Sequence, residues 1–236
     1  MIGDGRFRTQ LSRVEKLLKR LGLLEERAIS PNKELGVSQF KGLNYRQVYE
    51  TCLKEYVYDF RLADQSLLLF VKGGQNEHNG FLNFYYYECP VPVMSYIDFV
   101  FTELGLSPLD RKFDDEVAAW GDELRGEYEQ YVTSMESKNV VTPIRYDYKA
   151  TDYTEGLHPA SHVHFGFANE IRIGTRRIMN PISFVLLLIR QRYPDHWKQV
   201  LAVKAHQVLC SNVRDTIDEV NEAYWKELDL LEVALH

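Results

Sequence analysis

Near the start of the chain, apolar residues recur at spacings of three and four, at Leu11, Val14, Leu17, Leu18, Leu21 and Leu24. This is the spacing of one face of an α-helix, so it predicts an amphipathic helix over residues 9–26. The other positions of this segment are rich in Arg and Lys. These cations are interpreted most simply as the solvated face of a helix packed on the core, and a contact with nucleic acid or an acidic partner is the alternative.

Three later runs have the pattern of β-strands. Residues 57–62 alternate between polar and apolar, residues 66–72 are apolar on both faces, and residues 81–88 are mostly Phe and Tyr. The glycine-containing stretch 73–80 predicts a turn between the last two runs, so we expect an antiparallel meander. The aromatic rings at 84–87 could stack on nucleic-acid bases, although packing on the sheet is the simpler interpretation.

Helical patterns precede, separate and follow the strands. Asn44 is the expected N-cap of one short helix, and Asn180 followed by Pro181 matches the preferred opening of another. The helix expected at 114–137 is acidic and weakly amphipathic, so we place it at the surface. Besides the first helix, the expected helices cover residues 45–56, 95–104, 114–137, 181–192, 195–209 and 216–232.

A second strand region covers residues 139–177, with expected strands at 140–149, 161–168 and 170–174. The order of elements is therefore helix, strands, helices, strands, helices, which is typical of an α+β fold rather than of alternating βαβ units. No linker separates these parts. We expect a single domain over residues 1–236, in which a mainly antiparallel curved sheet is flanked by N-terminal, central and C-terminal helices.

Composition narrows the class of protein. The chain has 236 residues, of which 45% are hydrophobic and 26% charged, and its formal net charge is −6. This acidic balance argues against a globally basic nucleic-acid binder but leaves room for a local basic groove. The start lacks the apolar stretch of a signal peptide, and no apolar run approaches the roughly 20 residues of a membrane span. We therefore expect a cytoplasmic protein that does not insert into membranes.

The cysteines agree with that location. Cys52, Cys89 and Cys210 are odd in number, widely spaced, and form no Cys-x-x-Cys pair. This pattern argues against a disulfide framework and against a zinc ribbon, and it predicts reduced thiols.

Strand alternation groups chemically active side chains in the second strand region. The polar faces contain Arg145 and Asp147 on the first strand, His162 and His164 on the second, and Arg172 on the third. Alternate residues of a strand point to opposite faces of a sheet. If the apolar faces are buried together, these five side chains line one concave surface.

Two further residues extend this candidate site. His158 lies at the loop that enters the second strand, where the following Pro159 restricts its backbone. Arg176 lies just after the third strand and adds positive charge. The sequence thus predicts a site that combines three imidazoles, one carboxylate and several guanidinium groups.

Three chemistries fit these residues. His162 and His164, completed by His158 or Asp147, could bind a divalent metal ion such as Zn, Mn, Fe or Ni. Alternatively, the site could act without a metal on a phosphodiester. In that case His158, His162, His164 and Asp147 are the catalytic groups, while Arg145, Arg172 and Arg176 bind the phosphate. The third interpretation is a satisfied polar network with only a structural role.

The same segment resembles an uncharacterised bacterial family, classified as a domain of unknown function. The resemblance rests on Arg145-Tyr146-Asp147-Tyr148, on the His-Pro-x-x-His-x-His run from His158 to His164, on Arg172-Ile173, and on a helix opening in Pro-x-x-Phe at Pro181. It covers about a quarter of the chain. Members of that family resemble accessory proteins of mobile elements and phage-defence islands, so the resemblance implies a role in defence without implying an activity.

We therefore expect a nuclease or nucleotide phosphodiesterase in bacterial antiviral defence that uses the His/Arg/Asp cluster. The alternative is a non-catalytic binding or assembly subunit of a defence complex, which recognises nucleic acid or a partner protein. A third option is a metal-dependent hydrolase that acts on a small molecule. The sequence leaves the substrate, the divalent metal, the partner and the oligomeric state open.

Overall fold

The computed structural model describes residues 3–33, 40–74, 79–105, 107, 110–167 and 171–231. Within them, a seven-stranded antiparallel sheet has its strands in chain order, each paired with the next. Its strands are β1 (Leu24–Arg27), β2 (Phe60–Leu62), β3 (Leu67–Gly73), β4 (Phe81–Tyr87), β5 (Ile144–Lys149), β6 (Ser161–Phe165) and β7 (Arg172–Gly174). Both groups of predicted strands therefore belong to one sheet, and the predicted single-domain α+β fold is confirmed.

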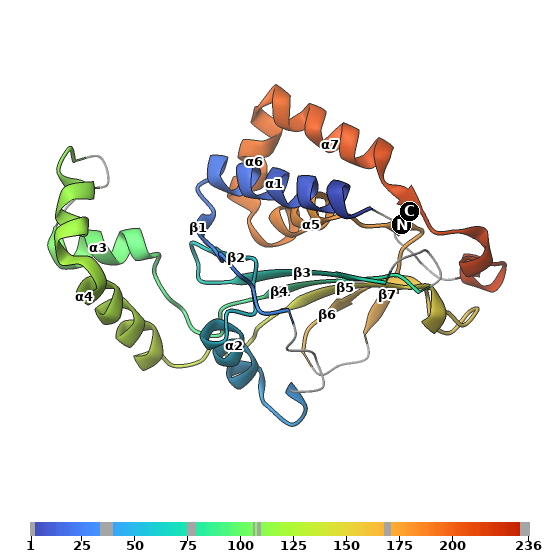
Figure 1. Ribbon diagram of the computed structural model, residues 1–236, viewed down its shortest axis with the longest axis horizontal. Coiled ribbons are helices and arrows are strands. Elements are labelled where there is room, and N and C mark those ends of the chain that lie inside the picture. Colours follow the sequence, from blue (N-terminus) through green and yellow to red (C-terminus); the bar gives the residue numbers. More distant parts are fainter. Residues whose placement is uncertain are drawn as a thin grey trace.

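The helices are distributed unequally over the two faces of the sheet. They are α1 (Asp4–Arg20), α2 (Tyr45–Lys54), α3 (Tyr96–Leu104), α4 (Phe113–Ser134), α5 (Pro181–Arg192), α6 (Pro194–Ala202) and α7 (Lys204–Thr216). In Figure 1, α1, α5, α6 and α7 lie on one side of the sheet and α2 on the other, while α3 and α4 extend away from the body. Within the described parts of the chain, no helix combines the length and apolar character needed to cross a bilayer.

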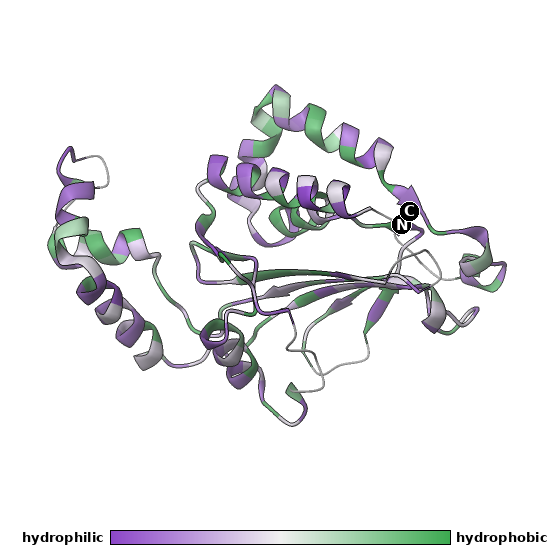
Figure 2. Cartoon of the chain, in the orientation of Figure 1, coloured by the Kyte–Doolittle hydropathy of each residue, from purple (hydrophilic) through white to green (hydrophobic). Residues whose placement is uncertain are grey.

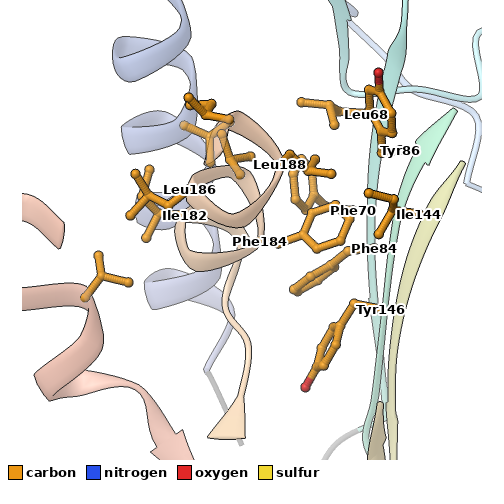
Figure 3. Close-up of a cluster of buried hydrophobic side chains, with 14 of the residues drawn as sticks. Leu68, Phe70, Phe84, Tyr86, Ile144, Tyr146, Ile182, Phe184, Leu186 and Leu188 are labelled. Carbon is orange, nitrogen blue, oxygen red and sulfur yellow. The ribbon is translucent and has the colours of Figure 1, made fainter. Parts of the chain in front are cut away.

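The main core lies between the sheet and α5. Phe70, Phe84 and Tyr146 point from the sheet toward Phe184 of α5 (Figure 3), and the rings of Phe84 and Phe184 have centroids 5.8 Å apart. These four aromatic side chains are fully buried, and burial of each Phe stabilises the fold by about 1.5–3 kcal/mol. The hydrophobic colour covers much of α5 and of β3 (Figure 2). This face of the sheet is thus filled by packing, which leaves the other face of the sheet open for a binding site.

The start of α5 follows the predicted capping chemistry. The Asn180 side chain accepts a hydrogen bond from Ser183 N, and the Ser183 hydroxyl lies 2.9 Å from Asn180 N in a reciprocal capping box. Pro181 occupies the first helical turn, where its missing N–H leaves no donor unpaired. The helix therefore begins and ends where the sequence predicts.

The first helix begins and ends earlier than predicted, and it covers Asp4–Arg20 rather than residues 9–26. It ends at Arg20, and Gly22 adopts φ +67°, so that Leu23 N donates to Leu18 O and Gly22 N to Lys19 O. This is the Schellman arrangement, which terminates a helix at a residue with positive φ. Leu24 therefore belongs to β1 rather than to the helix, and the predicted bounds 9–26 are wrong at both ends.

On α1 itself, the predicted division into two faces is correct. Val14, Leu17 and Leu18 are buried against the core, whereas Arg13 and Lys16 are exposed. The cations thus lie on the solvated face of a packed helix.

The C-terminal segment differs most from the prediction. The helix expected over 195–209 is two helices, α6 and α7, separated at Val203. The helix expected over 216–232 is absent from its described part, 216–231, beyond the last residue of α7. In its place are β9 (Asp218–Glu219), which pairs with β8 (Arg177–Ile178), and two short 3-10 helices, Glu222–Tyr224 and Leu228–Leu231.

A buried carboxylate explains the irregular end of this segment. Asp229 accepts hydrogen bonds from Tyr153 Oη at 2.6 Å, Gly156 N at 2.9 Å and Lys226 N at 2.8 Å. The bonds from Tyr153 and Gly156 fasten the segment to the loop before β6, while the bond from Lys226 lies within the segment. Because Tyr153 and Gly156 are more than 70 positions away in the chain, local helical propensity was outweighed by tertiary contacts.

Candidate functional site

The face of the sheet opposite the α5 core holds two rows of polar residues. Strand pairing places Asp147 directly between Asn83 of β4 and His162 of β6. Residues that face each other in an antiparallel ladder point to the same side of the sheet. Asn83, Asp147 and His162 therefore form one row across the sheet.

The second row lies two residues away along each strand. Arg145 is paired with Tyr85 on one side and with His164 on the other, and His164 is paired with Arg172 of β7. His164 thus lies between two arginines. The five side chains expected to share a concave surface, Arg145, Asp147, His162, His164 and Arg172, are on one face.

These rows form the floor of a pocket of 910 Å³, which we call the sheet pocket. Its opposite wall comes from residues 40–43 and from Val48 of α2. The wall and rim on the sheet side include Tyr85, Tyr87, Lys149, Asp152, His158 and Phe167. A pocket of this size, with a few convergent polar groups and apolar walls, is typical of a small-molecule or nucleotide site.

Asp147 is the centre of the polar network. Its Oδ2 atom lies 2.7 Å from Arg145 Nε, 3.4 Å from His164 Nε2 and 3.8 Å from His162 Nε2. Asn83 Nδ2 donates to the other carboxylate oxygen, Oδ1, at 2.7 Å. Burial on its own would raise the pKa of Asp147, but His164, Arg145 and Asn83 together lower it below its usual range, so the carboxylate is ionised.

His162 is held in one tautomer. Its Nδ1 atom lies 2.9 Å from Pro159 O, and since a carbonyl oxygen only accepts, Nδ1 is the protonated nitrogen. The lone pair on Nε2 is then directed toward Asp147. Burial lowers the pKa of His162 to about 4, despite the opposing effect of Asp147, so the ring is neutral at neutral pH.

His158 completes a row of three imidazoles. It lies in a small turn closed by backbone hydrogen bonds in both directions between Thr154 and His158, at 3.0 and 2.8 Å. Ring centroids are 5.0 Å apart between His158 and His162 and 4.8 Å apart between His162 and His164. The buried Nδ1 atom of His158 has no hydrogen-bond partner among the described residues. The three histidines are therefore together, with His158 at the rim.

Arg176 is not part of this constellation. Its side chain is 45% exposed, its guanidinium lies 3.9 Å from Glu219, and it does not line the sheet pocket. The prediction that Arg176 binds phosphate together with Arg145 and Arg172 therefore finds no geometric basis here. The chain turns between β7 and β8, which directs Arg176 toward β9.

Sequence reasoning missed Asn83, and it noted Tyr85 and Tyr87 only as rings that could stack on bases, without joining them to this site. Asn83, Tyr85 and Tyr87 alternate along β4 on the pocket side, and the parallel rings of Tyr85 and Tyr87 have centroids 5.6 Å apart. The alternation of β4 was visible in the sequence, but its pairing with β5 was not. Only that pairing brings Asn83 beside Asp147.

The arrangement has two chemical capacities. Asp147, His162 and His164 each offer one donor atom, and these atoms lie within 4.8 Å of one another, as a metal site requires. Arg145 and Arg172 flank them with positive charge suited to an anion.

Comparison with known proteins identifies one related family. A family model described as an uncharacterized conserved protein matches residues 23–225, which is most of the chain. No curated protein and no solved structure gives a match. The family match confirms the resemblance to a domain of unknown function, extends it well beyond the second half of the chain, and leaves the link to phage defence as a prediction.

Proposed function

The chain belongs to the uncharacterized conserved protein family DUF2290, whose description names no activity. From the sheet pocket, we propose that the protein hydrolyses a phosphodiester bond in a nucleotide or at the end of a nucleic-acid strand. The observation that supports this proposal is the combination on one pocket wall of three imidazoles, one carboxylate, two arginines and a pair of parallel tyrosine rings.

The two arginines would bind the phosphate. They flank His164 across the sheet, so an anion between them lies directly over that imidazole. Arg145 uses Nε toward Asp147, and its side chain remains 35% exposed. Guanidinium groups hold phosphate oxygens in bidentate fashion and stabilise the charge that develops in the transition state.

The rings of Tyr85 and Tyr87 would bind the nucleobase of the substrate. Tyr85 is the cross-strand neighbour of Arg145, so the aromatic wall begins next to the phosphate position. Stacking of a base on an aromatic ring contributes about 1–3 kcal/mol and tolerates different bases. A pocket of 910 Å³ accommodates one nucleotide.

The Asp147, His162 and His164 cluster would position and activate the attacking water. The water loses one proton to the solvent, and its oxygen forms a bond to phosphorus while the bond from phosphorus to the leaving oxygen breaks. The leaving oxygen takes up a proton. His158 is the candidate donor of that proton, since it lies at the rim beside the cluster and its buried Nδ1 has no partner among the described residues. Such a nuclease would suit the antiviral defence that the sequence resemblance implies.

The test compares two arginines that sequence reasoning treated alike. We expect the purified protein to cleave bis(p-nitrophenyl) phosphate or labelled single-stranded DNA or RNA in buffer with Mn²⁺ or Zn²⁺. Arg172→Gln should lower kcat/KM by about 100-fold or more, because a group that stabilises transition-state charge is lost. Arg176→Gln is the matched control and should leave kcat/KM unchanged, because Arg176 lies outside the pocket.

Melting temperatures of both variants report whether the fold is intact. Equal activity of two well-folded variants would contradict the proposal, as would the absence of turnover on every phosphodiester tested. Tight binding of a nucleotide without turnover would instead favour the alternative of a non-catalytic subunit that recognises nucleic acid.

A further inference from the structure

Donor atoms converge from two neighbouring strands on the floor of the sheet pocket. The pairing of β5 with β6 sets Asp147 opposite His162, and His164 lies on the same face two residues further along β6. His164 Nε2 and His162 Nε2 are 3.4 and 3.8 Å from Asp147 Oδ2. We propose that Asp147, His162 and His164 bind one divalent transition-metal ion, such as Zn²⁺ or Mn²⁺.

The spacing of these atoms is close to that of a real coordination sphere. Bonds of about 2.0–2.1 Å in a tetrahedral Zn²⁺ site separate neighbouring donor atoms by about 3.3 Å. The contact of His164 with Asp147 already has this length, and all three donor atoms lie within 4.8 Å of one another. Small side-chain rotations are enough to close the site around an ion.

Groups outside the cluster orient its donors as they do in known metal sites. A ligating histidine usually donates its other N–H to a carbonyl or carboxylate, which directs the free lone pair at the metal. Pro159 O plays this part for His162. Asn83 plays a similar part for Asp147, since it binds Oδ1 and leaves Oδ2 facing the two imidazoles.

The donor set selects the class of ion. Two imidazoles and one carboxylate suit Zn²⁺, Mn²⁺, Fe²⁺, Co²⁺ or Ni²⁺, whereas Mg²⁺ and Ca²⁺ prefer sites made of oxygen atoms alone. Three protein ligands also leave coordination positions open for a water and a phosphate oxygen. Use of the ion to activate water rests on the proposed function, whereas its binding does not.

The positive charge of Arg145 opposes the binding of a metal cation in this cluster. Arg145 Nε lies 2.7 Å from the same oxygen, Asp147 Oδ2, and its positive charge weakens the attraction of the carboxylate for a metal ion. Removing this charge should strengthen metal binding. Arg145→Gln therefore separates a metal site from a structural ion pair, because loss of an ion pair gives no gain in metal affinity.

The experiment measures metal binding without reference to catalysis. Wild-type protein stripped with a chelator is titrated with Zn²⁺ and with Co²⁺ by calorimetry, and the visible absorption of Co²⁺ reports nitrogen and oxygen ligation. We expect one ion per chain. Asp147→Asn, His162→Ala and His164→Ala should each weaken binding at least tenfold. His158→Ala, whose ring adjoins the cluster without contributing a donor atom, should bind the ion as tightly as the wild type, and Arg145→Gln should bind it more tightly.

Circular dichroism and melting of the stripped variants identify those that are folded, and the near-isosteric His164→Gln replaces His164→Ala if the latter does not fold. Absence of Zn²⁺ and Co²⁺ binding in the wild type overturns the inference, and so does equal affinity of wild type and folded ligand variants. Stoichiometric binding without phosphodiester cleavage supports the metal site and refutes the proposed function. Cleavage that persists in stripped protein with chelator present supports the proposed function and refutes the use of the ion to activate water.

Discussion

Two acidic side chains organise different parts of the molecule. Asp147 gathers Arg145, Asn83 and two histidines on the pocket floor. Asp229 accepts three hydrogen bonds, and two of them join the C-terminal segment to the loop between β5 and β6. In both cases hydrogen bonds to the charged form outweigh burial and lower the pKa of the carboxyl group. Replacing either carboxylate leaves several buried hydrogen-bond donors unpaired and therefore destabilises the fold.

We predict that Asp229→Ala lowers the free energy of unfolding at pH 7 by about 1–3 kcal/mol, since it leaves buried donors unpaired. Burial raises the pKa of Asp229, and the hydrogen bonds from Lys226, Tyr153 and Gly156 lower it by more. A lowered folded-state pKa gives stability that is present above the unfolded-state pKa, near 4, and lost as the pH falls through the folded-state value. Urea unfolding should therefore show a difference between variant and wild type that shrinks from pH 7 to pH 3. A difference that grows at low pH would contradict this account.

At the scale of elements, helix and strand ends are fixed by single positions. The Schellman turn at Gly22 ends α1 and directs the chain into β1, the edge strand of the sheet. At φ +67° a residue with a Cβ is strained even though the space around Gly22 is open.

Gly22→Ala should lower the free energy of unfolding by about 1–2 kcal/mol, because Ala disfavours the left-handed conformation. Gly5→Ala, in the first turn of the same helix and with equally open space, is the matched control. It should be neutral or stabilise the protein by up to about 1 kcal/mol. Chemical unfolding of both variants measures the difference, and a pair of equal values would refute the role assigned to the turn.

Some features of the strands and helices could be predicted from the sequence, and others could not. Period-two alternation is a local property, so the polar face of Arg145 and Asp147 and that of His162 and His164 were predictable. The meander of residues 57–88 was predictable, whereas the place of β1 in the sheet was not. The pairing that sets Asn83 beside Asp147 and the turn that directs Arg176 away from the pocket depend on the folded sheet. The end of α1 was readable at Gly22 and was missed, whereas the segment after α7 depends on Asp229 and its distant partners.

At the scale of the whole molecule, the packed core that stabilises the fold and the candidate site lie on opposite faces of the sheet. One face is packed with aromatic residues against α5, and the other forms the pocket. The arm formed by α3 and α4 extends from this body (Figure 1) and has a small hydrophobic cluster of its own, which includes Phe99, Leu124 and Tyr128. Its ion pair between Arg125 and Glu25 of β1 fixes the arm without involving the pocket.

Replacing residues 95–130 by a short Gly/Ser linker should therefore leave a folded protein. Met94 and Tyr131 flank the deletion and are in contact, so a short linker can join them. We expect metal affinity and kcat/KM to stay within about twofold of the wild type, measured on the small substrate bis(p-nitrophenyl) phosphate. If a well-folded variant loses cleavage of this substrate, the arm contributes to the active pocket and the separation is wrong.

The contact between Asp229 and Gly156 links the tail of the chain to the pocket entrance. Gly156 lies in the same tight turn as His158, and Leu228 packs beside it. Cleavage of the chain before Lys226 would remove the contacts of Asp229 and Leu228 with this turn. We expect His158 then to move away from His162 and His164. Changes at residues 226–229 are therefore expected to alter the position of His158, although these residues do not line the sheet pocket.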